Sequence, residues 1–135
     1  ASDGRRAQTR FDLRIPEDIS LYTDKLLLQS VIQNLLQNAI SYSDKEHPAV
    51  CVEITDQRSA VEISITDNGG GIADSVRPKI FEMFYRGHSD SSGPGLGLFI
   101  VRNALEKMGG TVRFECPSGK GTTFYVTLPK ELPTI

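Results

Sequence analysis

The chain has 135 residues, of which 39% are hydrophobic, and its 15 basic and 17 acidic residues give a formal net charge of −2. This length and hydrophobic content support one domain with a single core. Charges of both signs are interspersed along the chain, so the composition indicates neither a nucleic-acid partner nor direct contact with a membrane surface. Without a long apolar run or a signal-peptide pattern, we expect a cytoplasmic segment of a longer protein.

The two cysteines, Cys51 and Cys116, are far apart and show no Cys-x-x-Cys spacing. This pattern indicates neither a disulfide framework nor a zinc site. We therefore expect two buried, reduced thiols.

The first half of the chain predicts a linker, an edge strand and a long helix. Residues 1–9 are polar and aperiodic, so we interpret them as a linker remnant before a domain over residues 10–135. Residues 11–15 alternate and Pro16 ends the run, which is typical of an edge strand. Thr23 or Asp24 can then cap a helix, because apolar residues follow at three- and four-residue spacing: Leu27, Leu28, Val31, Ile32, Leu35, Leu36, Ala39 and Ile40.

The second half predicts two hairpins that flank helical segments. Residues 50–55 and 61–67 alternate and are joined by a polar turn, which favours an antiparallel pair. A short helical stretch over residues 76–84 precedes a glycine- and serine-rich loop over residues 87–93. A helix over residues 96–108 and a second hairpin, formed by residues 111–116 and 121–128, complete the chain.

The alternation in the strands indicates how the layers are arranged. Val61, Ile63 and Ile65 share one face of their strand, and polar residues occupy the other face. The last hairpin shows the same division, so helices should cover only one face of the sheet. The predicted fold class is therefore α/β, a two-layer sandwich with a largely antiparallel sheet.

Asp67 continues the inward-facing row of its strand, so its carboxylate should be buried at the strand end. A buried carboxylate needs a polar partner. The glycines at positions 69–71 would let a flat group approach the backbone, and an adenine amino group would suit the carboxylate. Alternatively, Asp67 caps the turn that follows it, as Asp-Asn-Gly sequences often do.

Asn34 and Asn38 are four residues apart on the predicted long helix and share one face. The side-chain oxygen of Asn38 is a credible magnesium ligand, because magnesium takes few protein ligands and is often shared with substrate phosphates. The alternative interpretation is a solvated polar stripe.

Gly93, Gly95 and Gly97 lead into the helix that begins near Leu96. Free backbone amides and the helix dipole at such a start can hold phosphate groups. The segment lacks the Gly-x-Gly-x-x-Gly spacing, because Leu98 stands at the third glycine, and it is not a Walker P-loop. The glycines at 119 and 121 are interpreted as a hairpin turn.

Arg86 follows an aromatic segment and directly precedes the glycine-rich loop. A guanidinium at this junction could fork onto phosphate oxygens. The alternatives are a core role for the aromatic residues and a solvated surface position for Arg86.

Together, these segments occur in a specific order: residues 34–39, 67–72, 80–86, 93–98 and 119–124. In this order they resemble the catalytic domain of sensor histidine kinases, over roughly residues 11–128. The resemblance implies the Bergerat fold of the gyrase, MutL and histidine kinase superfamily, a mixed sheet with helices on one side. It also implies that ATP with magnesium binds at the edge of the helical layer.

Carried over by position, the resemblance implies a role for each motif. Asn38 is similar to the magnesium ligand and Asp67 to the acceptor of the adenine amino group, while Asn34 and Arg86 take catalytic positions. The remaining implied nucleotide contacts are Tyr42, Gly69, Gly71, Gly93, Gly95, Leu96, Gly97 and Thr122. Residues 87–92 would form a short ATP lid whose closed form depends on a partner domain.

Two positions depart from the family pattern. Ser41 stands where members usually carry a lysine, which would remove one phosphate contact. Asn34 stands where the ATPase branches carry a glutamate that activates water, and an amide is not a base. We therefore expect phosphoryl transfer rather than hydrolysis.

The resemblance also implies partners outside this chain. His47 and His88 lie in polar loops, so the acceptor histidine is expected on a separate upstream dimerisation domain of the same protein. A response regulator, a homodimeric full-length protein and an anchor in the inner membrane are further expectations. The competing hypotheses are an anti-sigma-type serine kinase, another Bergerat-fold ATPase domain, and a degenerate domain without nucleotide.

Overall fold

The computed structural model describes residues 8–82, 97–117 and 121–131. Regular structure in these residues follows the order that the sequence predicts, with small shifts at the boundaries. The elements are β1 (Arg10–Arg14), α2 (Lys25–Tyr42), β2 (Ala49–Gln57), β3 (Ala60–Asp67), the 3-10 helix η1 (Arg77–Lys79), α3 (Gly97–Met108), β4 (Thr111–Glu115) and β5 (Thr122–Pro129).

The strands form one five-stranded mixed sheet in the order β1-β2-β3-β5-β4. β1 pairs parallel to β2 and stands at one edge, as the sequence predicts for this segment. β2 with β3, and β4 with β5, form the two predicted antiparallel hairpins. β3 pairs antiparallel to β5 at the centre, which brings the end of the first hairpin beside the start of the last strand.

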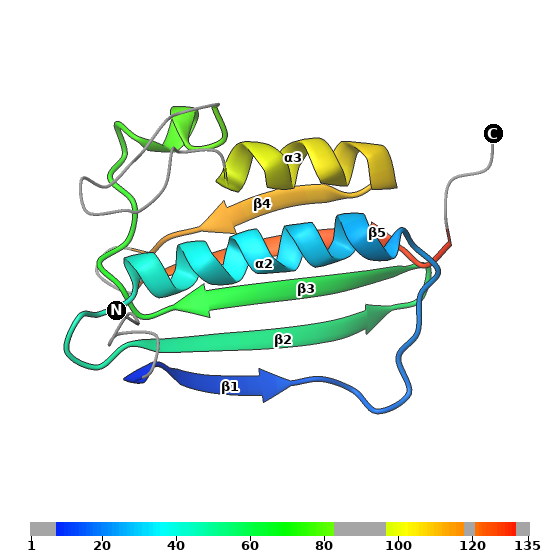
Figure 1. Ribbon diagram of the computed structural model, residues 1–135, viewed down its shortest axis with the longest axis horizontal. Helices are drawn as coiled ribbons and strands as arrows, with labels where there is room; N and C mark the ends of the chain where they lie inside the picture. The colour runs from blue at the N-terminus through cyan, green and yellow to red at the C-terminus, as the bar shows by residue number, and fades with distance from the viewer. Residues whose placement is uncertain (1–7, 83–96, 118–120, 132–135) are drawn as a thin grey trace.

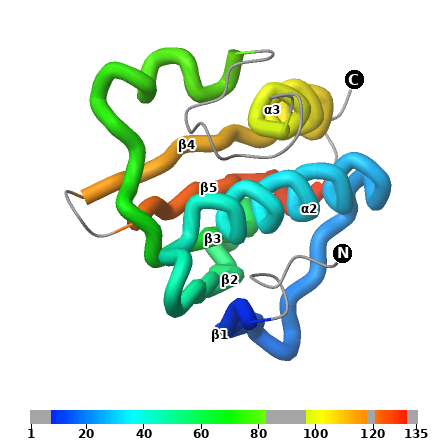
Figure 2. Tube along the Cα trace, turned by 60° about the vertical axis from the view of Figure 1, so that its left-hand side comes forward, coloured from blue at the N-terminus to red at the C-terminus, as the bar shows by residue number. Residues whose placement is uncertain are grey.

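Both helices lie on the same side of the sheet (Figure 1), and the turned view in Figure 2 shows the same two layers. The core fills the space between these layers, and its largest fully buried side chains come from α2, α3 and the inward rows of the strands. They are Leu35, Ile65, Leu105, Met108, Leu128, Val31, Val50, Val61, Val101 and Val126. The predicted two-layer α/β sandwich is confirmed.

Helix α2 begins where a capping residue is available. The Asp24 side chain accepts a hydrogen bond from the Leu27 backbone amide at 3.0 Å, which satisfies one of the free donors of the first turn. Of the two predicted caps, Asp24 is therefore the one used. None of the helices among the described residues has the length and hydropathy that crossing a bilayer requires.

The helical stretch predicted over residues 76–84 forms only in part among the described residues. Only the 3-10 turn Arg77–Lys79 forms there, with the Lys79 amide bonded to the Val76 carbonyl at 3.0 Å. Pro78 has no amide hydrogen, so it is tolerated in the first turn but offers nothing to extend the helix. After this short turn, Ile80 lies in the hydrophobic core and Phe81 packs against it.

Candidate functional site

Asp67 is the last residue of β3, and its side chain is only 3% exposed. It continues the buried row of Val61, Ile63 and Ile65, as the alternation predicts. Its Oδ1 atom accepts a hydrogen bond from the Gly69 backbone amide at 2.8 Å. The turn-capping alternative is therefore realised alongside the burial, and the two interpretations do not exclude each other.

Burial raises the pKa of the Asp67 carboxyl group to about 6. Hydrogen bonds from the backbone amides of Gly69 and Thr122 act in the opposite direction, because they favour the charged form. Desolvation is the larger effect, so the carboxylate is charged at neutral pH but held in an unfavourable environment. A ligand that donates a hydrogen bond to it would relieve this cost.

Thr122, on the neighbouring strand β5, pairs with Asp67 and is likewise only 3% exposed. Gly121 precedes it with a positive φ of 79°, and a Cβ at Gly121 would overlap the Asp67 carbonyl oxygen. Only glycine permits this approach. The sequence predicts that Thr122 faces inward, and its burial agrees; its pairing with Asp67 is a finding of the structure.

The turn after Asp67 is confined by two neighbours. A Cβ on Gly69 would overlap the carbonyl oxygen of Tyr42, the last residue of α2. Gly71 has a φ of 88°, and a Cβ there would lie 2.6 Å from the sulfur of Cys116. The backbone from Gly69 to Gly71 therefore takes a path that side chains at positions 69 and 71 would block.

One face of α2 connects this turn to the start of α3. Asn34, Asn38 and Tyr42 follow one another at four-residue spacing, about 6 Å apart along the helix axis. The Asn34 amide nitrogen donates to the Ser30 carbonyl oxygen at 2.7 Å, and its Oδ1 would lie 3.3 Å from a Cβ on Gly97. Tyr42 meets Gly69 at the other end, so Asn38 lies between the two contacts.

Asn38 is half-buried, and no hydrogen-bond partner for its side chain is found among residues 8–82, 97–117 and 121–131. Its amide oxygen is therefore available to a ligand. The same residues contain no group of three His, Cys, Asp or Glu side chains that could hold a metal ion by themselves. An ion beside Asn38 would need oxygen ligands from elsewhere, as magnesium shared with phosphates does.

Helix α3 begins at Gly97, opposite Asn34. Amides in the first turn of a helix lack intrahelical acceptors, and the helix dipole makes this end partly positive. The start of α3 can therefore hold an anionic group. Arg86, Gly93, Gly95 and Leu96, together with the predicted lid at 87–92, lie outside the described residues.

Sequence reasoning missed three residues that support the site, namely Asn68, Arg77 and Cys116. The Asn68 side chain accepts from the amides of Asp44 and Ala49, at 3.0 and 3.1 Å, and donates to the His47 carbonyl oxygen at 2.7 Å. It ties the turn to the loop before β2. The only sequence signal was its place in an Asp-Asn-Gly turn, which does not name partners some twenty residues away.

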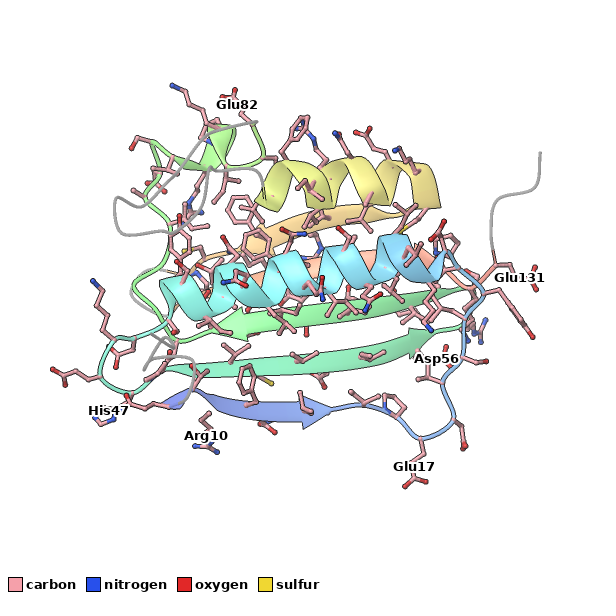
Figure 3. All side chains as sticks on the ribbon, viewed as in Figure 1. Arg10, Glu17, His47, Asp56, Glu82 and Glu131 are labelled. Atoms are coloured by element: carbon pink, nitrogen blue, oxygen red, sulfur yellow. The ribbon has the colours of Figure 1, made fainter. Side chains whose placement is uncertain are left out.

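Both cysteines are free thiols, as expected, but the expectation that they are buried is wrong. Each is partly exposed, and the Cys116 sulfur accepts a hydrogen bond from the Ile72 amide at 2.9 Å. Cys116 also packs against the hydrophobic core, so its sulfur has both apolar and polar neighbours. His47 is exposed in its loop and points away from the domain (Figure 3).

A buried carboxylate beside a glycine turn, two side-chain amides on one face of α2, and a second helix start are features of an α/β sandwich that suit a nucleotide. Residues 23–132 match the family described as histidine kinase-, DNA gyrase B-, and HSP90-like ATPase. The chain belongs to this family.

Curated relatives include full-length sensor kinases. The chain is 35% identical over 124 residues to the sensor histidine kinase AtsR of Burkholderia thailandensis, which covers 87% of this chain and 21% of AtsR. It is 36% identical over 135 residues to the sensor-like histidine kinase SenX3 of Mycobacterium tuberculosis, which covers 96% of this chain and 32% of SenX3. The chain therefore spans a third or less of these relatives, which contain further regions.

Solved structures agree with the sequence relatives. The mycobacterial sensor histidine kinase MprB superposes with a TM-score of 0.81 at 30% identity, over 96% of this chain and 89% of that one. ShkA, solved at full length in complex with AMPPNP, gives a TM-score of 0.80 at 26% identity, over 98% of this chain and 28% of that one. These likenesses identify an ATPase-type catalytic domain of histidine kinases and do not favour the competing serine kinase or ATPase hypotheses.

Replacing Gly69 by alanine should destabilise the domain by about 1–3 kcal/mol, because the new methyl group would overlap the rigid carbonyl of Tyr42. Gly70→Ala is the matched control. A Cβ there meets nothing within 4 Å, so the free energy of unfolding should stay within about 0.5 kcal/mol of the wild type. Urea denaturation of the two variants measures the difference, and equal stabilities would contradict the described turn.

Asp67→Asn should change how stability depends on pH. Between about pH 4 and 6 the folded wild type binds more protons than the unfolded chain, because burial raises the pKa of Asp67, so its stability falls as the pH rises through this window. Asparagine does not titrate. Relative to the variant, the wild type should lose on the order of 2–3 kcal/mol between pH 4 and 7.

The free energy of unfolding of both proteins, measured by urea denaturation across this range, provides the test. Asp56→Asn is the control, because a hydrogen bond from Lys130 lowers the pKa of the Asp56 carboxyl group. Asp56 therefore contributes stability that is lost as the pH falls through its folded pKa, which is the opposite sign. A pH-independent difference between wild type and Asp67→Asn would contradict the assignment.

Proposed function

We propose that this chain binds ATP with magnesium and donates the γ-phosphoryl group to a histidine on a separate domain of the same protein. The observation that carries the proposal is the buried Asp67 carboxylate beside the Gly69–Gly71 turn, with a pKa raised to about 6. A protein retains such a group at a cost in stability when a ligand needs it.

The adenine end of the proposed site consists of Asp67, Thr122 and the glycine turn. Asp67 accepts from the exocyclic amino group of the base, and Thr122 supports the carboxylate from the neighbouring strand. Gly69 and Gly71 leave the backbone free of side chains where the base enters. Tyr42, whose carbonyl borders Gly69, packs near the base.

The phosphate end lies between α2 and the start of α3. Asn38 offers an amide oxygen to magnesium, and a bound magnesium ion would neutralise phosphate charge there. Gly93, Gly95, Leu96 and Gly97 are proposed to supply backbone amides, and Arg86 a guanidinium. Ser41 stands where the family usually carries a lysine, so we expect a weaker hold on this end than members with the lysine have.

Asn34 directs the proposed reaction toward transfer. Its side chain is an amide, which accepts no proton from water at neutral pH, and its nitrogen already donates to Ser30. The domain therefore positions ATP without activating a water molecule. Phosphoryl transfer depends mainly on positioning and charge neutralisation, so an incoming imidazole can serve as the nucleophile.

We infer that the acceptor histidine belongs to a helical dimerisation domain upstream of Ala1 in the same protein. His47 is exposed in a loop, and His88 lies outside the described residues. A homodimeric, cytoplasmic kinase region that passes phosphate to a response regulator completes the proposal. The length of the relatives supports this, since the chain spans only 21% of AtsR and 32% of SenX3.

ATP with magnesium should raise the melting temperature of the wild-type chain, because a ligand that binds only the folded state stabilises it. Asn38→Ala and Asp67→Asn should each remove most of the shift, whereas Gly70→Ala should retain it. Thermal denaturation with ATP, with ATP and EDTA, and without nucleotide separates the base contribution from the metal contribution. An unchanged melting temperature at millimolar nucleotide would count heavily against the proposed function.

When supplied with the upstream helical domain and ATP, the chain should form acid-labile phosphate on that domain, as expected for phosphohistidine. Alone, it should release negligible inorganic phosphate. Radiolabelled ATP followed through acid and base treatment measures both outcomes. Robust hydrolysis by the purified chain that Asn38→Ala abolishes would overturn the transfer mechanism, since contaminating ATPases would not respond to that substitution.

A further inference from the structure

The segment after β3 is fastened to the end of β4 by a side chain that no motif includes. Figure 1 shows this segment leaving β3 and passing the sheet edge where β4 ends. Arg77, at the start of η1, donates from Nε to the Ile72 carbonyl oxygen at 3.2 Å. It also donates from a terminal nitrogen to the Cys116 carbonyl oxygen at 2.9 Å.

Ile72 is held at both of its backbone polar groups. Its amide donates to the Cys116 sulfur at 2.9 Å, and its carbonyl accepts from Arg77. The Thr122 hydroxyl contacts the same sulfur at 3.5 Å. Ile72, the residue after Gly71, is therefore tied to Cys116 at the end of β4. Through the Cys116 sulfur it is also linked to Thr122, which pairs with Asp67.

The position of this linkage matters for the base end of the site. Gly71 lies between the anchored Ile72 and the turn whose Gly69 amide bonds to Asp67. Gly71 has a φ of 88°, but glycine also adopts many other backbone conformations. The glycine itself therefore does not fix the path of the backbone. The anchor at Ile72 does so, and it fixes the turn before any ligand arrives.

The linkage contributes more to geometry than to stability. The Arg77 side chain is 37% exposed and its ion-pair partner Asp74 is 97% exposed, at 3.3 Å. Exposed ion pairs of this kind stabilise proteins little. A fork that bridges two carbonyl groups of separate segments nevertheless restricts their relative position, and pre-organisation of that kind improves binding.

We propose that Arg77 is a positioning residue for the nucleotide, acting through Ile72 and Cys116 to hold the glycine turn in its base-accepting conformation. This inference rests on the proposed ATP binding at Asp67. It predicts that losing the fork weakens adenine binding and adenine selectivity more than it weakens the fold.

The test compares Arg77→Leu and Arg77→Lys with the wild type. Leucine removes the donors and keeps bulk, while lysine keeps the charge but lacks the planar fork. Calorimetry should show ADP–magnesium binding weakened about tenfold in both variants, with the preference for ADP over GDP reduced. Melting temperatures without nucleotide should stay close to the wild type. Arg113→Leu is the matched control, because Arg113 lies on β4 and forms ion pairs with Glu62 of β3 and Glu115 of β4.

Cys116 provides a second arm through the other half of the linkage. Cys116→Ser keeps an acceptor for the Ile72 amide and should retain ADP affinity, whereas Cys116→Val removes the acceptor and should lose it by a similar factor. If Arg77→Leu does not fold, Arg77→Lys and this serine–valine pair decide the question.

Each outcome has one meaning. Wild-type protein that fails to bind ADP overturns the proposed function itself. Wild-type binding with unchanged affinity and selectivity in the folded variants overturns only the positioning role. A loss of melting temperature without nucleotide that matches the loss of affinity assigns Arg77 to fold stability, and it too overturns the inference.

Discussion

The burial of one carboxylate, that of Asp67 at the end of the central strand β3, constrains everything around it. At 3% exposure the group is costly to charge, and its raised pKa measures that cost. The neighbouring backbone compensates in part, because the amides of Gly69 and Thr122 both donate to it. For these amides to point inward, β5 must approach closely, which the glycine at position 121 permits. The free apoprotein is thereby less stable than it could be, and this is the usual sign of a group kept for a ligand.

The two ends of the site are prepared to different degrees within the described residues. At the base end, the turn after Asp67 is fixed on three sides, by the Tyr42 carbonyl, by the Cys116 sulfur and by the Asn68 side chain. At the phosphate end, Asn38 presents an amide oxygen without a partner in the described part of the chain, and α3 begins nearby, opposite Asn34. Under the proposed function, a nucleotide would therefore meet a preformed base site, while its phosphates and metal would complete the coordination at the other end.

The sequence predicted the features that depend on local periodicity. Alternation in β3 identified the buried row that ends at Asp67, and the three- and four-residue spacing in α2 identified the helix and its asparagine face. The parallel pairing of β1 with β2 and the placement of β5 beside β3 depend on long-range packing, which no window of sequence contains. For the same reason, the sequence did not predict the hydrogen bonds of Arg77, Cys116 and Asn68. Arg77 and Cys116 are 39 residues apart and Asn68 bonds across 24 residues, so their partners became visible only in three dimensions.

Asn34 connects this architecture to the division of labour proposed for the reaction. Its nitrogen is bonded within α2 and its oxygen faces the start of α3, so the side chain joins the two helices that border the phosphate end. A carboxylate at this position could take a proton from water, and an amide does not. Under the proposed transfer, the domain supplies positioning and charge neutralisation, and the nucleophile arrives on another domain. Without a general base at this position, ATP bound here would be hydrolysed slowly, and its γ-phosphate would stay available until the acceptor imidazole docks.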